Sequence, residues 1–432
     1  MTIYDEAMQM KEELVACRRD LHAHPELAWT EFRTASHVAK SLKALGYEVL
    51  MGDACMKADE MMGVPDKAEL SRAMGWAIKE GADPELVKKM EGGKTGVVGI
   101  MHFAKPGKTV GLRFDMDCLL VEENPTDAHR PTRDGFASTH PGLMHACGHD
   151  GHTAIGLGVA RLIAAHKDEM AGTVKLCFQP GEEGVMGARG MVASGIVDDV
   201  DYFLSGHIGL GNGENNSLVC MTEGFLATSK IDAFFTGKPA HAGANPQNGR
   251  NALLAAAQAS LALHTISRHS DGPSRINVGI LKAGTGRNVI PDNAVIKFET
   301  RGGSTAINEF MEGEARRMIK AAADMYGVTV KMVARGSAAS GNSSPDMGEE
   351  VYEVVKGLGV YSDIEKNHTV SGSEDCSYFM SRVQDHGGKA VYMLYGTEEA
   401  SGHHTSEFDF NEDVLPLSVY TVTELVKHFT NK

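Results

Sequence analysis

The chain has 432 residues, of which 42% are hydrophobic and 23% are charged, and its formal net charge at pH 7 is −15. This length exceeds one ordinary hydrophobic core and predicts two domains, and the composition is that of a soluble globular protein. The acidic excess argues against nucleic acid and anionic membrane surfaces as partners, since both would be repelled.

The seven cysteines and the N-terminus indicate a cytoplasmic protein. The cysteines are odd in number and scattered along the chain, which suits reduced thiols better than a disulfide framework. The first residues lack the basic and apolar regions of a secretory signal. No run of about 18 apolar residues occurs, so we expect no membrane span.

Helices and strands alternate through the first half of the chain. Its amphipathic patterns predict helices at 12–17, 30–45 and 153–165, a charged helical segment at 54–92, and strands at 96–101, 109–114, 173–178 and 202–204. Strands that alternate with helices favour a largely parallel or mixed sheet covered on both faces. We therefore expect an α/β domain.

A second pattern begins near residue 224. It predicts strands at 231–235, 275–282, 294–300 and 328–334 and helices at 251–267 and 305–325. This β-α-β-β-α-β order is typical of a ferredoxin-like, split βαβ unit. A polar stretch follows, and another strand is expected at 390–395. We therefore expect a first domain at 1–223 and 337–432, interrupted by an inserted domain at 224–336.

Residues 144–152, MHACGHDGH, hold one thiol, one carboxylate and three imidazoles just before an apolar helix. The side chains of Cys147 and His149, two residues apart, can both reach one divalent metal. The alternative is a redox thiol or a polar helix cap. The other strand ends argue against that alternative, because they supply further ligands.

Each of these further ligands follows a predicted strand, where open α/β sheets place their ligands. Glu182 and Glu183 follow strand 173–178, and His207 ends the strand near 202–204. His403 and His404 follow strand 390–395 and compete for one ligand position. Asp115 and Asp117 follow strand 109–114 and are placed to orient the ligands.

Five protein ligands are more than one tetrahedral zinc ion requires. The predicted ligands are Cys147, His149, Glu183, His207 and His404. Two metal ions about 3.5–4 Å apart with a bridging thiolate or water suit this set better. Manganese and zinc both fit the mixed donors. Glu182 remains as a general base, so the sequence predicts hydrolysis of an amide without a covalent intermediate.

The inserted domain adds three candidate site residues. His241 lies in a loop after a strand and is placed to donate a hydrogen bond to an oxyanion. Asn288 lies in a turn, and Arg301 lies at the end of strand 294–300. An Arg can bind a substrate carboxylate with two parallel hydrogen bonds, so we expect Asn288 and Arg301 to bind that group.

These motifs resemble the M20 metallopeptidases, and within them the amidohydrolase branch. The matching segments are 18–27, 144–152, 179–183, 240–242, 288–291 and 372–375. Residues 54–92, 130–138 and 402–410 are most similar to the p-aminobenzoyl-glutamate hydrolases of that branch. Gly181 and Cys376 depart from the usual Ala and Phe, and neither touches the proposed chemistry.

The resemblance implies two divalent metals, Glu182 as the base and a lid domain that forms a homodimer. It also implies that His241 serves the active site of the partner subunit. It favours His404 as the last metal ligand. A second assembly that it suggests is a heteromer with a related B-type subunit. The expected substrate is a small N-acyl amino acid with an aromatic acyl group and an acidic amino acid. A broad-specificity deacylase or dipeptidase, and a non-catalytic member of a hydrolase complex, are the alternatives.

Overall fold

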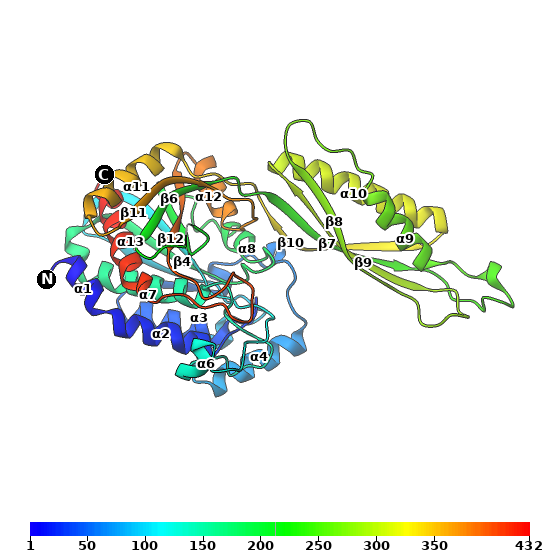
Figure 1. Ribbon diagram of the computed structural model, residues 1–432, viewed down its shortest axis with the longest axis horizontal. Coiled ribbons are helices and arrows are strands. Elements are labelled where there is room, and N and C mark those ends of the chain that lie inside the picture. Colours follow the sequence, from blue (N-terminus) through cyan, green and yellow to red (C-terminus); the bar gives the residue numbers. More distant parts are fainter. Residues whose placement is uncertain (212) are drawn as a thin grey trace. The chain divides into compact units, whose positions relative to one another are not determined.

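The computed structural model describes residues 1–211 and 213–432, which form two compact units (Figure 1). The first unit comprises residues 1–223, 342–370 and 378–432, and the second comprises 224–341 and 371–377. The expected boundary at 336 differs from this division, because strand β10 (Thr329–Ala338) continues to pair with its neighbour beyond a bulge at 334–336. Residues 371–377 join the second unit because the Leu226 amide donates to the Gly372 carbonyl.

The first unit contains a mixed eight-stranded sheet in the order β1-β2-β4-β3-β5-β12-β6-β11. Its strands are β1 (Glu48–Met51), β2 (Val97–His102), β3 (Lys105–Asp115), β4 (Ala171–Gln179), β5 (Tyr202–Ile208), β6 (Ser217–Glu223), β11 (Asp363–Thr369) and β12 (Lys389–Gly396). Parallel and antiparallel pairs both occur, so the predicted mixed sheet is confirmed. The sequence patterns did not predict β1, β6 and β11. Strand β11 is polar and partly exposed along its length, so it lacks the alternation of apolar and polar residues that marks a half-buried strand.

Helices cover both faces of this sheet. They are α1 (Ile3–Gln9), α2 (Lys11–Ala23), α3 (Phe32–Ala44), α4 (Lys67–Lys79), α5 (Pro84–Lys89), α6 (Arg130–Asp134), α7 (His149–Ala165), α8 (Ala188–Val192), α11 (Pro345–Leu358), α12 (Ser377–Asp385) and α13 (Val414–Thr430). Tyr202 stacks on Phe429 of α13, while Phe203 stacks on Phe379 of α12. Successive strand residues point to opposite faces, so α13 and α12 lie on opposite sides of the sheet.

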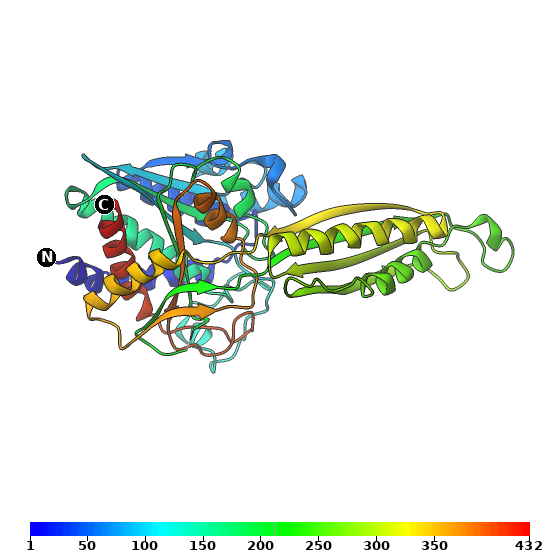
Figure 2. The ribbon, with the colours of Figure 1, turned by 90° about the horizontal axis from the view of Figure 1, so that it is seen from above.

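The second unit has the expected β-α-β-β-α-β order. It consists of β7 (Ala227–Thr236), α9 (Ala252–Leu263), β8 (Ser274–Ala283), β9 (Asn293–Gly302), α10 (Thr305–Tyr326) and β10. The antiparallel sheet has the order β10-β7-β9-β8, and Figure 2 shows both helices running alongside its strands. Alternate residues of β7, Ile231, Ala233 and Phe235, share a core with Met311 and Ile319 of α10.

Among residues 1–211 and 213–432, no helix combines the length and the apolar composition needed to cross a bilayer.

Candidate metal centre

Four adjacent parallel strands end at the same edge of the first unit's sheet. β4, β3, β5 and β12 are neighbours and run in one direction. The predicted site residues follow these ends, namely Asp115 and Asp117 after β3, Glu182 and Glu183 after β4, His207 within the end of β5, and His403 and His404 after β12. The sheet topology therefore gathers segments that are far apart in the sequence.

Helix α7 begins at this edge with His149, two residues after Cys147. Gly148, its N-cap, has φ 87°, a left-handed conformation that glycine adopts without steric cost. The turn at Gly148 separates Cys147 from His149 at the start of the helix. α7 packs close to the sheet because of Gly156, where a Cβ atom would lie 2.7 Å from the rings of Phe114 and Phe178.

His149 and His207 both direct their Nε2 atoms to this site. His149 Nδ1 lies 2.9 Å from the Asp117 carbonyl oxygen, and His207 Nδ1 lies 2.6 Å from the Ile208 carbonyl oxygen. A carbonyl oxygen only accepts, so each Nδ1 carries the proton and each Nε2 is left as a ligand atom. His207 Nε2 lies 3.5 Å from Cys147 Sγ.

Among several candidate groups of ligand atoms, two share the Cys147 thiol. Cys147, His149 and His207 form one group, and Cys147, Glu183 and His404 form the other. Within each group the candidate atoms all lie within 4.8 Å of one another. These sulfur, nitrogen and oxygen donors would suit two divalent metal ions.

The electrostatics of these residues fit a bound cation. His149 Nε2 and Glu183 Oε1 are buried and form no hydrogen bond with any of the described residues. Burial opposes charge on His149, but the carboxylates of Asp115 and Asp117 raise its pKa to about 10. Burial and the neighbouring carboxylates raise the pKa of the Cys147 thiol well above its usual range. Divalent cations would replace the His149 proton and favour the thiolate, so the donor set fits metal ions.

Asp117 fixes the loop that carries the two glutamates. Its Oδ1 accepts from the Glu182 amide at 3.0 Å, and its Oδ2 accepts from the Glu183 amide at 2.9 Å. Both glutamate side chains are 12% exposed, and one oxygen of each lies 3.9 Å from His149 Nε2. Glu182 is therefore held beside the ligand atoms, as a base acting on a nearby water molecule requires.

His152 forms a further candidate group with Asp115 and His149, but both of its ring nitrogens already have protein partners. Its Nδ1 lies 2.6 Å from Asp115 Oδ1, and its Nε2 accepts from the Ile208 amide at 2.8 Å. Both nitrogens are therefore occupied by protein groups. His152 instead ties α7 to the ends of β3 and β5, since Asp115 ends β3 and Ile208 ends β5.

His403 and His404 occupy different surroundings. His404 Nε2 lies 3.5 Å from Glu183 Oε1, and its amide donates to the Ala146 carbonyl at 2.7 Å. His403 Nδ1 lies 3.5 Å from Cys147 Sγ, but its Nε2 lies 2.9 Å from Glu399 Oε1. His404 belongs to the second ligand group, whereas His403 belongs to none of the candidate groups among the described residues.

The predicted residues of the inserted domain fall at two separate places. The loops of His241 and Asn288 lie together, because the Ala242 amide donates to the Asn288 carbonyl at 3.0 Å. His241 Nδ1 accepts from the Gly243 and Ala244 amides, so its proton lies on Nε2, and its side chain is exposed. That exposed N–H is suited to donate to an oxyanion.

Arg301 lies at the opposite end of β9 from this loop pair. Arg301 pairs with Thr228 of β7, and Asn293 at the other end of β9 pairs with Thr236. About 27 Å of strand therefore separates Arg301 from Asn293. Arg301 donates to Glu299 at 2.9 and 3.3 Å and lines a polar cavity that also contains Arg268 and Arg275. Within one chain the inserted domain therefore does not bring Arg301 to His241.

The sequence patterns missed a buried charged cluster beside this centre. Arg18 of α2 is fully buried and bonded to Asp150, the residue after His149. The only local signal was the spacing of Arg18 and His22, which puts both on one face of a helix. Their carboxylate partners lie more than a hundred residues away, where no local pattern can find them.

A mixed sheet with paired ligand groups at its carboxyl edge and an inserted ferredoxin-like domain define a two-domain metal-dependent hydrolase. Residues 111–428 match the family model of peptidase family M20/M25/M40, and the chain belongs to this family. The resemblance predicted from the motifs is thereby confirmed.

The chain is similar along its whole length to known amidohydrolases. It is 48% identical over 422 residues to the indole-3-acetyl-aspartic acid hydrolase of Enterobacter agglomerans, covering 98% of this chain and 97% of that protein. It is 47% identical over 413 residues to a p-aminobenzoyl-glutamate hydrolase subunit of Escherichia coli K12, covering 95% and 94%. The crystal structure of an aminobenzoyl-glutamate utilization protein from Klebsiella pneumoniae matches with a TM-score of 0.85 and 38% identity, covering 99% and 98%. The protein is a metal-dependent amidohydrolase of this family.

Proposed function

We propose that this protein hydrolyses the amide bond of an N-acyl amino acid with an aromatic acyl group and a glutamate or aspartate, such as p-aminobenzoyl-glutamate. One observation carries the chemistry, namely two ligand groups that share Cys147 with Glu182 held beside them. The similarity to hydrolases named for an aromatic acyl-aspartate and an aromatic acyl-glutamate supports the substrate class.

Two divalent ions, manganese or zinc, are the cofactors of this proposal. Cys147, His149, His207, Glu183 and His404 would hold them. When bound, such a pair polarises the amide carbonyl and lowers the pKa of a water molecule. Glu182 takes a proton from the water molecule that attacks the amide carbonyl, and it passes this proton to the nitrogen of the leaving amino acid.

The inserted domain supplies the groups that bind the rest of the substrate. The Nε2–H of His241 donates to the oxyanion that forms on the scissile carbonyl. Arg301 binds the carboxylate of the amino acid, because its fork suits two parallel hydrogen bonds. Asn288 lies beside His241 rather than Arg301, so it reaches that carboxylate from the other copy of the chain. The distance between His241 and Arg301 in one chain supports a site to which two copies contribute, with His241 acting on the partner's substrate.

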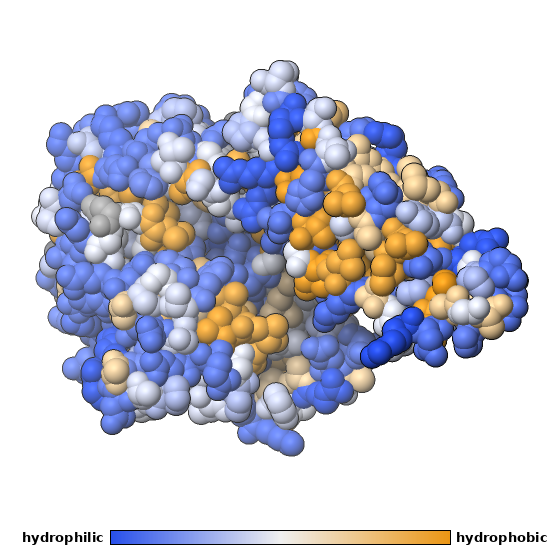
Figure 3. Space-filling model, turned by 45° about the vertical axis from the view of Figure 1, so that its right-hand side comes forward, coloured by the Kyte–Doolittle hydropathy of each residue, from blue (hydrophilic) through white to orange (hydrophobic). Residues whose placement is uncertain are grey.

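A homodimer through the inserted domain follows from the same argument. Figure 3 shows hydrophobic residues gathered on the surface of this domain. The large apolar side chains that it exposes include Leu254, Leu261, Ile280, Leu281 and Met325. A pairing between copies would bury such a surface. The Escherichia coli relative is named as one subunit of its hydrolase, so a heteromer is the second possible assembly.

The first test is hydrolysis by the purified chain alone. After the protein is loaded with Mn²⁺ or Zn²⁺, we expect it to hydrolyse p-aminobenzoyl-glutamate and indole-3-acetyl-aspartate. Release of the amino acid measures the hydrolysis. We expect no hydrolysis after the metal is removed by a chelator. Loss of the side-chain carboxylate, as in p-aminobenzoyl-alanine, should lower kcat/KM about 10–100-fold, since hydrogen bonds to charged groups contribute about 1.5–3 kcal/mol. Absence of turnover by metal-loaded protein with every N-acyl acidic amino acid would refute the proposal.

The second test separates the two neighbouring histidines. His404→Ala should weaken binding of the second metal ion by at least about 10²-fold, more than loss of an outer partner. His403→Ala removes a side chain near Cys147 that is bonded to Glu399. We expect this change to weaken metal binding by about 100-fold or less. Titration of the metal-free proteins measures both values. A greater loss in His403→Ala would exchange the two assignments.

A further inference from the structure

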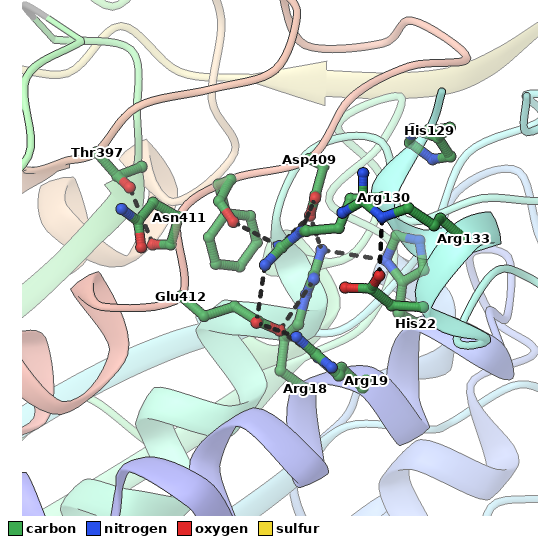
Figure 4. A network of polar contacts seen from close by, with 12 residues as sticks. Arg18, Arg19, His22, His129, Arg130, Arg133, Thr397, Asp409, Asn411 and Glu412 are labelled. Carbon is green, nitrogen blue, oxygen red and sulfur yellow. Dashed lines mark hydrogen bonds and ion pairs between the residues drawn. The ribbon is translucent and has the colours of Figure 1, made fainter. Parts of the chain in front are cut away.

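A buried cluster of charged side chains connects three helices to the loop after β12 (Figure 4). This group, which we call the Arg18 cluster, consists of Arg18, Arg19, His22, Glu123, Arg130, Asp150, Asp409 and Glu412. The side chains of Arg18, His22 and Asp150 are 0% exposed. None of these residues takes part in the chemistry proposed above, so the cluster needs another explanation.

The geometry defines the charge of His22. Its Nδ1 lies 2.8 Å from Asp150 Oδ2, and its Nε2 lies 3.0 Å from Glu123 Oε1. Carboxylates only accept, so both nitrogens donate and the ring is an imidazolium. The four carboxylates of the Arg18 cluster therefore face three guanidinium groups and one imidazolium. Buried charges of this kind are tolerated only when each is paired and hydrogen-bonded.

Arg18 joins two of the segments that carry the candidate metal ligands. Its Nε donates to Asp150 Oδ2 at 2.8 Å, and Asp150 directly follows His149 in the first turn of α7. Its Nη2 lies 3.0 Å from Asp409 Oδ1, and its Nη1 lies 3.3 Å from Glu412 Oε1. Those two carboxylates follow His404 in the loop that leads to α13.

The Phe410 ring holds this guanidinium in place. The Arg18 Cζ lies 4.4 Å from the centre of the Phe410 ring, which belongs to the same loop. Arg130 reinforces the loop from the other side, because it donates to both Asp409 oxygens and to Glu412. One planar cation thus touches both ligand-bearing segments at fixed angles, which a lysine ammonium cannot do.

We propose that Arg18 is a positioning residue that holds the 147–150 turn and the 403–412 loop at the separation two metal ions require. This inference rests on the metal centre of the proposed function. Arg18 lies outside the ligand set and acts through Asp150, Asp409 and Glu412. Outer residues that orient ligands typically change metal affinity 10–100-fold, without taking part in the chemistry.

Metal titration of Arg18→Lys tests this role, with Arg19→Lys as the matched control. Arg19 donates to Glu412 at 2.9 and 2.7 Å, but among the described residues its cluster hydrogen bonds go to Glu412 alone. We expect Arg18→Lys to bind Mn²⁺ or Zn²⁺ about 10–100-fold more weakly and Arg19→Lys to stay within about threefold of the wild type. At saturating metal, the kcat of Arg18→Lys should return to within about threefold of the wild-type value.

Wild-type affinity in folded Arg18→Lys would overturn the proposal, and so would an equal loss in both variants. If Arg18→Lys does not fold, Asp409→Asn provides a second test, since it is nearly isosteric and weakens one of the two ion pairs between Arg18 and the loop. Unchanged affinity there would also overturn the proposal. A wild type without metal affinity would remove the metal centre and this inference with it. A wild type that binds metal but hydrolyses no N-acyl amino acid would refute the substrate alone.

Discussion

Glu182→Ala is expected to lose at least about 10²-fold in kcat while keeping its metal ions, because general-base catalysis contributes that much or more. Glu182 belongs to neither of the two ligand groups that share Cys147. Its backbone amide is held by Asp117, so removal of the side chain leaves the loop in place. Two measurements on the purified variant at saturating metal test Glu182 as the base. They are its steady-state kinetics and its metal content.

Glu398→Ala is the matched control for the loss of a carboxylate. Glu398 is exposed, and only its backbone forms hydrogen bonds among the described residues, to Asn215 and Asn411. We expect its kcat to equal that of the wild type, since exposed substitutions away from a site are nearly neutral. Wild-type turnover by metal-loaded Glu182→Ala would refute Glu182 as the base. Loss of metal from that variant would make Glu182 a ligand instead.

His241→Ala should lower kcat about 10²–10³-fold, the usual cost of losing one oxyanion donor. The side chain is exposed, so we expect the fold, the stability and the metal content to be unchanged. His264→Ala, which removes another exposed histidine of the inserted domain, is the matched control and should retain full activity. Full activity in His241→Ala would remove this residue from the mechanism.

A mixture of the two inactive variants tests whether His241 acts across subunits. In a mixed dimer of His241→Ala and Glu182→Ala chains, one site receives an intact Glu182 from one chain and an intact His241 from the other. Random exchange makes half of the dimers mixed, with one good site of two, so about a quarter of the wild-type activity should return. No recovery from chains shown to exchange would mean that His241 serves its own subunit.

The sequence alone predicted most features that depend on residues close to one another along the chain. The spacing of Cys147 and His149 before a helix and the adjacent pair Glu182 and Glu183 after a strand are local motifs, and they indicated candidate ligands without knowledge of the strand order. Periods of two and 3.6 residues predicted the inserted β-α-β-β-α-β domain, since side-chain periodicity follows directly from backbone geometry. Strands β1, β6 and β11 were missed, because they lie at or near the sheet edges and carry weak alternation.

The tertiary structure decided which distant groups meet. The order β4-β3-β5-β12 brings four strand ends together, and this arrangement places His404 beside Glu183 and His403 beside Glu399. Arg18 and Asp150 are 132 residues apart, and no periodic pattern links them. Buried charges must find partners in a medium of low dielectric constant, and packing of the whole domain selects those partners. The sequence by itself therefore determined which residues can bind metal, whereas the fold determined where they meet and what holds them there.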